Sequence, residues 1–154
     1  MSQRKVNIFD RIGTLIPGYN GYSERDSRRN CDKKIRSYIS TSLNEINSKI
    51  ELKMGVLIKE NNYEDFEKYE HLRKDINIIS DKVLYSASAS TSFFSDEIIG
   101  VDELDKIYEI DLSMSESINN FFLNEIWDFN KLEDLISKIN QSMTDRNNFI
   151  KKFN

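Results

Sequence analysis

Residues 19–36 bring together the side chains best suited to bind a charged partner. The set consists of Tyr19, Tyr22, Arg25, Arg28, Arg29, Asp32 and Arg36, with Lys33 beside them. The charged members follow one another at helical spacing, which predicts one polar ridge along the start of a helix. Guanidinium groups offer paired planar donors to carboxylates and phosphates, and tyrosines supply contact area typical of protein interfaces. We therefore predict a partner-binding surface at this ridge.

The charge distribution leaves a second interpretation of the ridge open. Residues 1–40 carry nine Lys and Arg against four acids, whereas residues 96–134 carry two Lys against twelve acids. The net charges of these segments are therefore +5 and −10, within a chain of net charge −4. Because positive side chains near a helix N-terminus oppose the helix dipole, helix stability alone does not explain the arginines. They could instead pair with the acidic segment inside the same bundle.

Catalytic chemistry has little support in the sequence. Neither a Gly-x-Gly-x-x-Gly nor a Gly-x4-Gly-Lys-Ser/Thr string occurs, and the chain has one His and one Cys. Glu67 and His71 lie four residues apart, which favours a surface pair on one helix face. Cys31 lies one helical turn before Ile35, which favours a buried, unreactive thiol. We predict no catalytic residue, no metal ligand and no cofactor; an enzyme built from scattered carboxylates and tyrosines is the third hypothesis.

Length and composition predict one folded domain over residues 1–154. Charged residues make up 31% and hydrophobic residues 38% of the chain, a balance that argues against intrinsic disorder. Five Gly and one Pro are too few for the turns of an all-β fold or the phosphate loops of a doubly wound α/β fold. The single Cys fits a reducing cytosol, and charges interrupt the only apolar stretch near the N-terminus. We expect a cytoplasmic protein without a secretion signal.

A short helix is predicted over residues 6–16. Its apolar stripe consists of Val6, Phe9, Ile12, Leu15 and Ile16, and Pro17-Gly18 ends it. The basic residues Arg4, Lys5 and Arg11 make this helix amphipathic, a pattern that can lie on an anionic membrane surface. The other interpretation is that the stripe docks on the core of the bundle.

The remaining chain predicts an all-α, antiparallel bundle of about four principal helices with this short N-terminal amphipathic helix. Apolar residues recur every three or four positions over residues 23–60 and 62–85, which should form a helical hairpin, and over 97–128 and 130–152. Ser23 is the predicted N-cap of the first of these helices. Residues 86–95 read Ser-Ala-Ser-Ala-Ser-Thr-Ser-Phe-Phe-Ser and are predicted to be a loop, anchored by Phe93-Phe94.

Three strings carry a resemblance to a family of small uncharacterised bacterial helical proteins. They are Phe9-Asp10-Arg11-Ile12, Ile16-Pro17-Gly18-Tyr19-Asn20-Gly21-Tyr22 followed by Arg25, Arg28, Arg29 and Asp32, and Leu104-Asp105-Lys106-Ile107-Tyr108-Glu109-Ile110-Asp111-Leu112. In that family a Gly/Tyr-rich stretch often precedes the Phe-Phe element, whereas this chain has small serines and alanines there. The resemblance implies a bacterial, helical, intracellular protein and carries no known activity.

Together these patterns favour a non-catalytic protein–protein interaction module, an adaptor or regulatory subunit, as the leading hypothesis. Its partner would be an unidentified protein or a second copy of the chain. The alternative hypothesis is a peripheral protein of an anionic membrane surface that uses the helix over residues 6–16 and the basic residues near it. Nucleic acid is not expected as a partner, because the chain is acidic and has no recognised binding motif.

Overall fold

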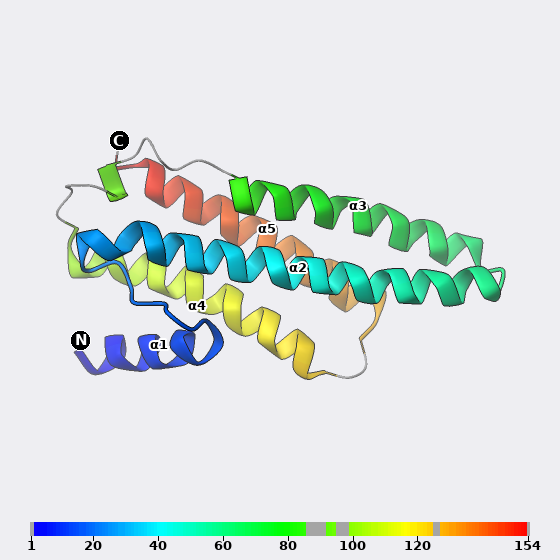
Figure 1. The fold of residues 1–154 in the computed structure, drawn as a ribbon, viewed down its shortest axis with the longest axis horizontal. Coiled ribbons are helices and arrows are strands. Elements are labelled where there is room, and N and C mark those ends of the chain that lie inside the picture. The colour runs from blue at the N-terminus through cyan, green and yellow to red at the C-terminus, as the bar shows by residue number, and fades with distance from the viewer. Residues whose placement is uncertain (1, 86–91, 95–98, 125–126, 154) are drawn as a thin grey trace.

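The computed structural model describes residues 2–85, 92–94, 99–124 and 127–153. Over these residues the chain forms five α-helices and no strand, which confirms the all-α bundle (Figure 1). The helices are α1 (Ser2–Leu15), α2 (Arg28–Lys59), α3 (Tyr63–Tyr85), α4 (Val101–Leu123) and α5 (Phe129–Lys151). Two short 3-10 helices, η1 (Arg25–Ser27) and η2 (Ser92–Phe94), precede α2 and α4.

The longest helices, α2 and α3, form the predicted antiparallel hairpin. All seven apolar residues of the predicted α2 seam are buried: Ile35, Ile39, Leu43, Ile46, Ile50, Met54 and Leu57. Between the helices Asn61 takes a left-handed φ of 57°, and the amide of Asp65 donates to Asn62 Oδ1 at 3.2 Å. Asparagine tolerates the left-handed conformation and caps helices well, so the Asn pair ends α2 and starts α3 between the two predicted helical ranges.

The other helices pack around the inner half of this hairpin. In Figure 1, α2 and α4 run toward the hairpin turn, α3 and α5 run back from it, and α1 lies beside α4. The end of α4 and the start of α5 both lie short of the hairpin turn, so the outer part of α2 and α3 projects beyond the other helices. Apolar residues from every α-helix and from η2 share one core.

The long second helix starts five residues later than predicted. Residues 22–24 are not helical, because the amide of Tyr22 donates to the hydroxyl of Tyr108 on α4 at 2.7 Å and ties the chain there. The N-cap of α2 is Ser27, not Ser23, and its hydroxyl donates backward to the carbonyl of Glu24 at 2.9 Å. The prediction of a helix from residue 23 is therefore wrong.

Smaller differences occur in the later helices. The third helix starts at Tyr63, one residue later than predicted, and this tyrosine is 62% exposed because it lies beside the turn. The fourth helix ends at Leu123, since Asn124 has an extended backbone, and it continues unbroken through residues 113–115. Of the predicted 86–95 loop, residues 86–91 and 95 lie outside the described residues, while Phe93 and Phe94 are buried and anchor the chain as expected.

None of the helices in the described part of the chain has the length and apolar character needed to cross a bilayer.

Candidate functional site

Most of the predicted partner-binding ridge lies inside the molecule. The buried members are Tyr19, Tyr22, Arg28, Asp32 and Arg36. Arg29 is exposed and its guanidinium lies 5.3 Å from the ring centroid of Phe94, while the side chain of Arg25 is not among those described. The expectation of one exposed ridge is therefore wrong for the five buried residues. Arg28, Asp32 and Arg36 lie on the face of α2 that enters the core, next to Cys31 and Ile35, whereas Tyr19 and Tyr22 lie in the loop before α2.

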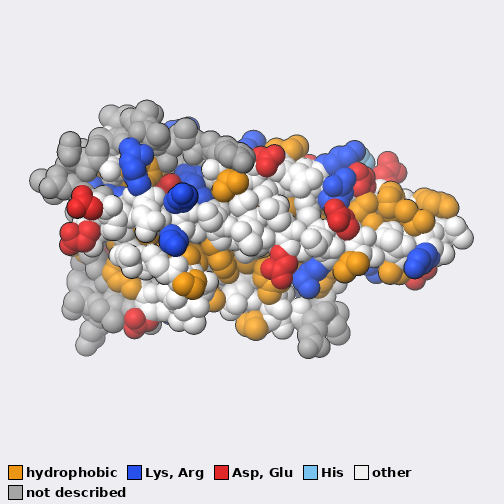
Figure 2. Space-filling view, viewed as in Figure 1, with side chains coloured by type: hydrophobic (Ala, Val, Ile, Leu, Met, Phe, Trp, Pro, Cys, Tyr) orange, Lys and Arg blue, Asp and Glu red, His pale blue; other side chains and the backbone are white. Residues whose placement is uncertain are grey.

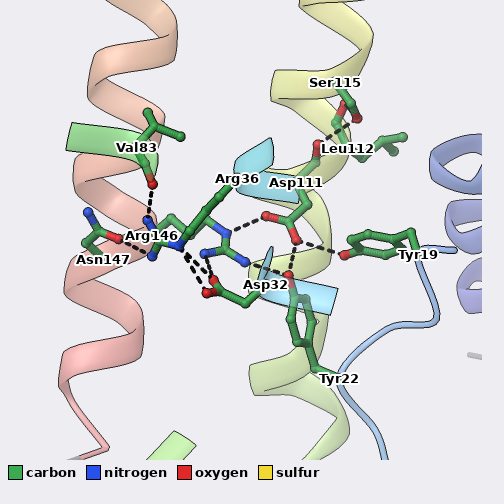
Figure 3. A network of polar contacts seen from close by, with 10 residues as sticks. All are labelled: Tyr19, Tyr22, Asp32, Arg36, Val83, Asp111, Leu112, Ser115, Arg146 and Asn147. Atoms are coloured by element: carbon green, nitrogen blue, oxygen red, sulfur yellow. Dashed lines mark hydrogen bonds and ion pairs between the residues drawn. The ribbon is translucent and has the colours of Figure 1, made fainter. Parts of the chain in front are cut away.

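Two residues outside the predicted set, Arg146 of α5 and Asp111 of α4, hold the centre of a buried polar network (Figure 3). Both side chains are 0% exposed. Arg146 Nε donates to Asp111 Oδ1 at 2.8 Å, and the same guanidinium also donates to Asp32 Oδ1 and to the hydroxyl of Tyr22. The second oxygen of Asp111 accepts from both tyrosines, from Tyr22 at 2.7 Å and from Tyr19 at 2.8 Å.

Arg36 and Arg28 extend the network to neighbouring elements. Arg36 Nε donates to both oxygens of Asp32, at 3.1 and 3.0 Å. Its two terminal nitrogens donate to the carbonyl of Val83 at the end of α3 and to Asn147 Oδ1 on α5. Arg28 donates to the carbonyls of Tyr22 and Phe93, at 2.7 and 3.1 Å. Arg28 thus holds the loop before α2 and η2, whereas Arg36 holds the last turn of α3 and a side chain of α5.

Burial dominates the electrostatics of the network. It raises the pKa of Tyr19 and Tyr22 well above the usual value, and the nearby carboxylate of Asp111 raises both further. Burial alone would lower the pKa of Arg146, but the negative charges around it, Asp111 foremost, hold that pKa well above its usual value. Both tyrosines therefore remain hydroxyl donors and Arg146 remains charged across the physiological pH range.

The charged groups at the centre of the network pair with one another. Two arginines, Arg36 and Arg146, face two carboxylates, Asp32 and Asp111, so these four charges balance. The network joins the loop after α1 to α2, α4 and α5, and through Val83 to α3 (Figure 3). Buried ion pairs of this kind specify which elements meet, although their net stabilisation is modest because desolvation is costly. The physical role that this geometry supports is positioning of helices.

The attraction between basic and acidic segments is realised in part. Arg11 of α1 forms a bidentate ion pair with Glu116 of α4, and Tyr19 and Tyr22 donate to Asp111 in the acidic segment. The buried arginines of α2 find other partners, since Arg36 pairs with Asp32 of its own helix. Pairing with the acidic segment therefore holds for Tyr19 and Tyr22 of the ridge, and for Arg11 outside it, but Arg36 of α2 pairs with Asp32 instead.

The N-terminal helix is docked on the bundle. Ile12 and Ile16, members of the stripe proposed for a membrane surface, are buried against the core with Ile8. Phe9 and Leu15 pack on the core with part of their surface exposed, and the ring of Phe9 meets Tyr108 edge to face at 4.8 Å. The side chain of Val6 is not among those described. This helix would have to leave α4 before its apolar face could enter a membrane.

Two further expectations about reactive side chains are confirmed. Cys31 is a free, buried thiol whose pKa burial raises to about 12, so very little of it is thiolate at neutral pH. His71 Nε2 lies 3.7 Å from Glu67 Oε1, and both side chains are largely exposed. The pair lies on the surface of α3.

Sequence reasoning missed Arg146 and Asp111, although their positions carried a signal. Asp111 lies on the buried stripe of α4, whose other members are Leu104, Ile107, Tyr108, Ser115 and Ile118. Arg146 does the same in α5, between Met143 and Ile150. A charged residue at an apolar stripe position must find a buried partner, because an unpaired buried charge is very costly. Looking for opposite charges at such positions would have selected Asp32, Arg36, Asp111 and Arg146.

Four of the eight large apolar side chains that are exposed in the described part of the chain lie at the projecting end of the hairpin. We call residues 52–66 the hairpin end. Its exposed apolar residues are Leu52, Val56, Ile58 and Tyr63, and Leu52 is 75% exposed. Figure 2 shows hydrophobic side chains over this end of the molecule. The aromatic contacts of Tyr69 with Trp127 and Phe129 lie just inside it, where α5 begins.

Comparison with protein-family models, with curated proteins and with solved structures finds no match for this chain.

Proposed function

We propose that this chain is a non-catalytic protein-interaction module, an adaptor or regulatory subunit, and that the hairpin end is its contact surface. The observation that carries the proposal is the exposure of Leu52, Val56, Ile58 and Tyr63 on a part of α2 and α3 that the other helices do not cover. Neighbouring apolar side chains exposed together are typical of protein contact sites.

The face of α2 that carries Val56 supports this assignment. Tyr38 lies eighteen residues earlier, which is five helical turns, so the two side chains project from the same side of α2. At Tyr38 this side is covered by α4, where the tyrosine hydroxyl lies 3.5 Å from the carbonyl oxygen of Ser115. At Val56 the cover has ended, because α4 stops at Leu123. A partner helix could continue along α2 the packing that α4 begins.

The proposed setting is a bacterial cytoplasm. A chain whose single cysteine is a free, buried thiol is suited to a reducing compartment. The resemblance of the Ile16–Tyr22 string and the following arginines to small bacterial helical proteins supports the same setting.

Site-specific photo-crosslinking in native cells tests the contact surface. A photoreactive residue at position 56 should give a discrete adduct of higher mass, and one at position 102, on the exposed first turn of α4, should not. Replacing Leu52 by Ser should then remove the adduct from position 56, because it removes the most exposed apolar side chain of the hairpin end.

A matched substitution controls for a general effect of lost surface hydrophobicity. Leu123 at the end of α4 is 71% exposed, close to the 75% of Leu52, so Leu123→Ser changes a similar side chain at another place. The adduct should survive in this variant. Equal adducts from positions 56 and 102, or an adduct that Leu52→Ser leaves unchanged, would overturn the proposed contact surface.

A further inference from the structure

A groove runs between α3 and α5 on a part of the molecule separate from the exposed side of the hairpin end. Its larger section has a volume of about 430 Å³, and a smaller section of about 80 Å³ continues it toward Val83 and Asn147. The two sections share Ile79, Lys82 and Asn140. The groove therefore follows α3 from Leu72 to Val83, about 16 Å at 1.5 Å per residue, which is about three helical turns.

The floor of the groove is apolar and one apolar side chain stands exposed on its rim. Leu72, Ile79 and Ile136 are buried at the bottom. Ile78 lines the same section and is 55% exposed. Exposed isoleucine beside a buried apolar floor is suited to receive further apolar side chains, because their burial releases water from both surfaces.

The rim of the groove is acidic at the end nearer the start of α5. Asp75 of α3 and Glu133 and Asp134 of α5 line this end, against a single basic residue, Lys82, farther along. In the described part of the chain no ion pair involves any of these three carboxylates. No ion pair within the described residues neutralises these charges, and they would favour positive charge on a molecule that lies in the groove.

We propose that this groove binds an amphipathic helix of another protein, with an apolar ridge on the floor and lysines or arginines facing Asp75, Glu133 and Asp134. A helix fits because a groove between two helices accepts the side-chain ridge of a third, and because the length matches about three turns. The acidic rim selects a basic helix over an acidic one, since like charges across an interface cost binding free energy. This site is additional to the hairpin end and does not depend on it.

Two designed peptides of about 14 residues test the groove directly. Both carry leucines on one helical face; the opposite face carries lysines in the probe and glutamates in the control. Fluorescence anisotropy with the whole protein should show saturable binding of the lysine peptide and little binding of the glutamate peptide. Ile78→Ser should weaken binding of the lysine peptide about tenfold, equivalent to about 1.4 kcal/mol.

Charge reversal separates the groove from general attraction to an acidic protein. The double variant Glu133→Lys with Asp134→Lys should weaken the lysine peptide at least about tenfold and strengthen the glutamate peptide. The double variant Glu45→Lys with Glu51→Lys makes the same change of net charge on exposed positions of α2 outside the groove, and it should leave both peptides nearly unchanged. Circular dichroism checks that each variant is folded.

Three outcomes would overturn the proposal. The lysine peptide could fail to bind, it could bind every variant equally, or it could respond to the α2 reversal as strongly as to the α5 reversal. Sedimentation of the protein alone is measured beside them, because a dimer that Ile78→Ser dissociates would identify a second copy as the occupant and refute a basic helix. The crosslinking result at position 56 is independent of all these outcomes.

Discussion

The two ends of the hairpin formed by α2 and α3 use their side chains in opposite ways. At the end near the chain termini, arginines, aspartates and tyrosines are buried around Arg146 and Asp111 (Figure 3). At the hairpin end, Leu52, Val56, Ile58 and Tyr63 are exposed. The charged residues of types suited to binding are thus buried and paired inside the fold. Apolar residues of the type usually found in a core are instead exposed to solvent.

The difference follows from how many elements surround each end. Near Arg146 four helices and the loop after α1 converge, so polar groups can be buried because each finds a partner. Among the described helices, α2 and α3 alone meet at the hairpin end, and each can bury one face against the other. In a two-helix unit, a second apolar face on either helix stays exposed to solvent. Residue type therefore indicates exposure only when the number of packing neighbours is known.

The largest expected effect is at the buried end. Arg146→Ala leaves Asp111 and Asp32 without their shared donor and should lower the free energy of unfolding by about 3–5 kcal/mol. Arg73→Ala, which removes an ion pair with Glu70 on the surface of α3, should cost much less, because solvent screens an exposed pair. Urea denaturation measures both. Equal losses in the two variants would mean that burial of the network adds nothing.

A second substitution tests how tightly the loop after α1 is held. Gly21 has a φ of +84°, and an added Cβ would lie 2.6 Å from Phe9 Cε1 and 2.9 Å from the hydroxyl of Tyr108. Gly21→Ala should therefore cost about 2–3 kcal/mol from backbone strain and overpacking. Thermal unfolding followed by circular dichroism gives the change. An unchanged melting temperature would show that the loop can move away from α4.

Alkaline pH should weaken the buried end specifically. Burial raises the pKa of Cys31 and of Tyr108 to about 12, above their ordinary values of 9.0 and 10.0. The unfolded chain loses these protons first as pH rises, so stability is intact below pH 9 and falls between pH 9 and 12, by at most about 1.4 kcal/mol per pH unit for each group.

The control for this pH effect is Cys31→Ala. Because the ordinary thiol value lies below that of tyrosine, the variant should lose less stability than the wild type between pH 9 and 10. The measurement is the midpoint of urea denaturation at each pH. Identical pH profiles for the two proteins would contradict a protonated, buried thiol.

The smallest expected effect has the opposite sign and lies within the hairpin end. Gly55 is within α2 and an added Cβ would meet nothing within 4 Å. Gly55→Ala should stabilise the protein by about 0.5–1 kcal/mol, because alanine favours the helix and removes backbone freedom from the unfolded chain. Paired urea titrations of wild type and variant can detect the change. A loss of stability would mean that α2 needs flexibility at this position.

Helix periodicity was enough to predict the bundle and its hairpin. The α2 seam from Ile35 to Leu57 is buried throughout, and the Asn61-Asn62 pair ends the helix. The turn marked by Pro17-Gly18 also lies where expected, after α1. These features depend on residues near one another in the chain, which local propensities describe well.

The candidate site could not be predicted in the same way. Arg36 was interpreted as a surface residue because its partners Val83 and Asn147 lie 47 and 111 positions away in sequence. The start of α2 was misplaced because the Tyr22 amide is taken by Tyr108, 86 positions away. The position of a charged residue on an apolar stripe was the one sign of burial in the sequence, and it does not identify the residue with which the charge pairs. The exposed end of the hairpin was missed because Leu52, Val56 and Ile58 lie off the apolar seam of α2, and helical spacing does not indicate where the neighbouring helices end.

The short connection between α2 and α3 also has a kinetic consequence. Three residues join these helices, so their contacts close small loops, whereas the bond between Arg146 and Tyr22 joins residues 124 positions apart. Loop closure costs more entropy as the separation grows, and folds rich in local contacts form faster. We therefore expect folding to begin at the hairpin end and to finish when the guanidinium of Arg146 pairs with Asp32 and Asp111.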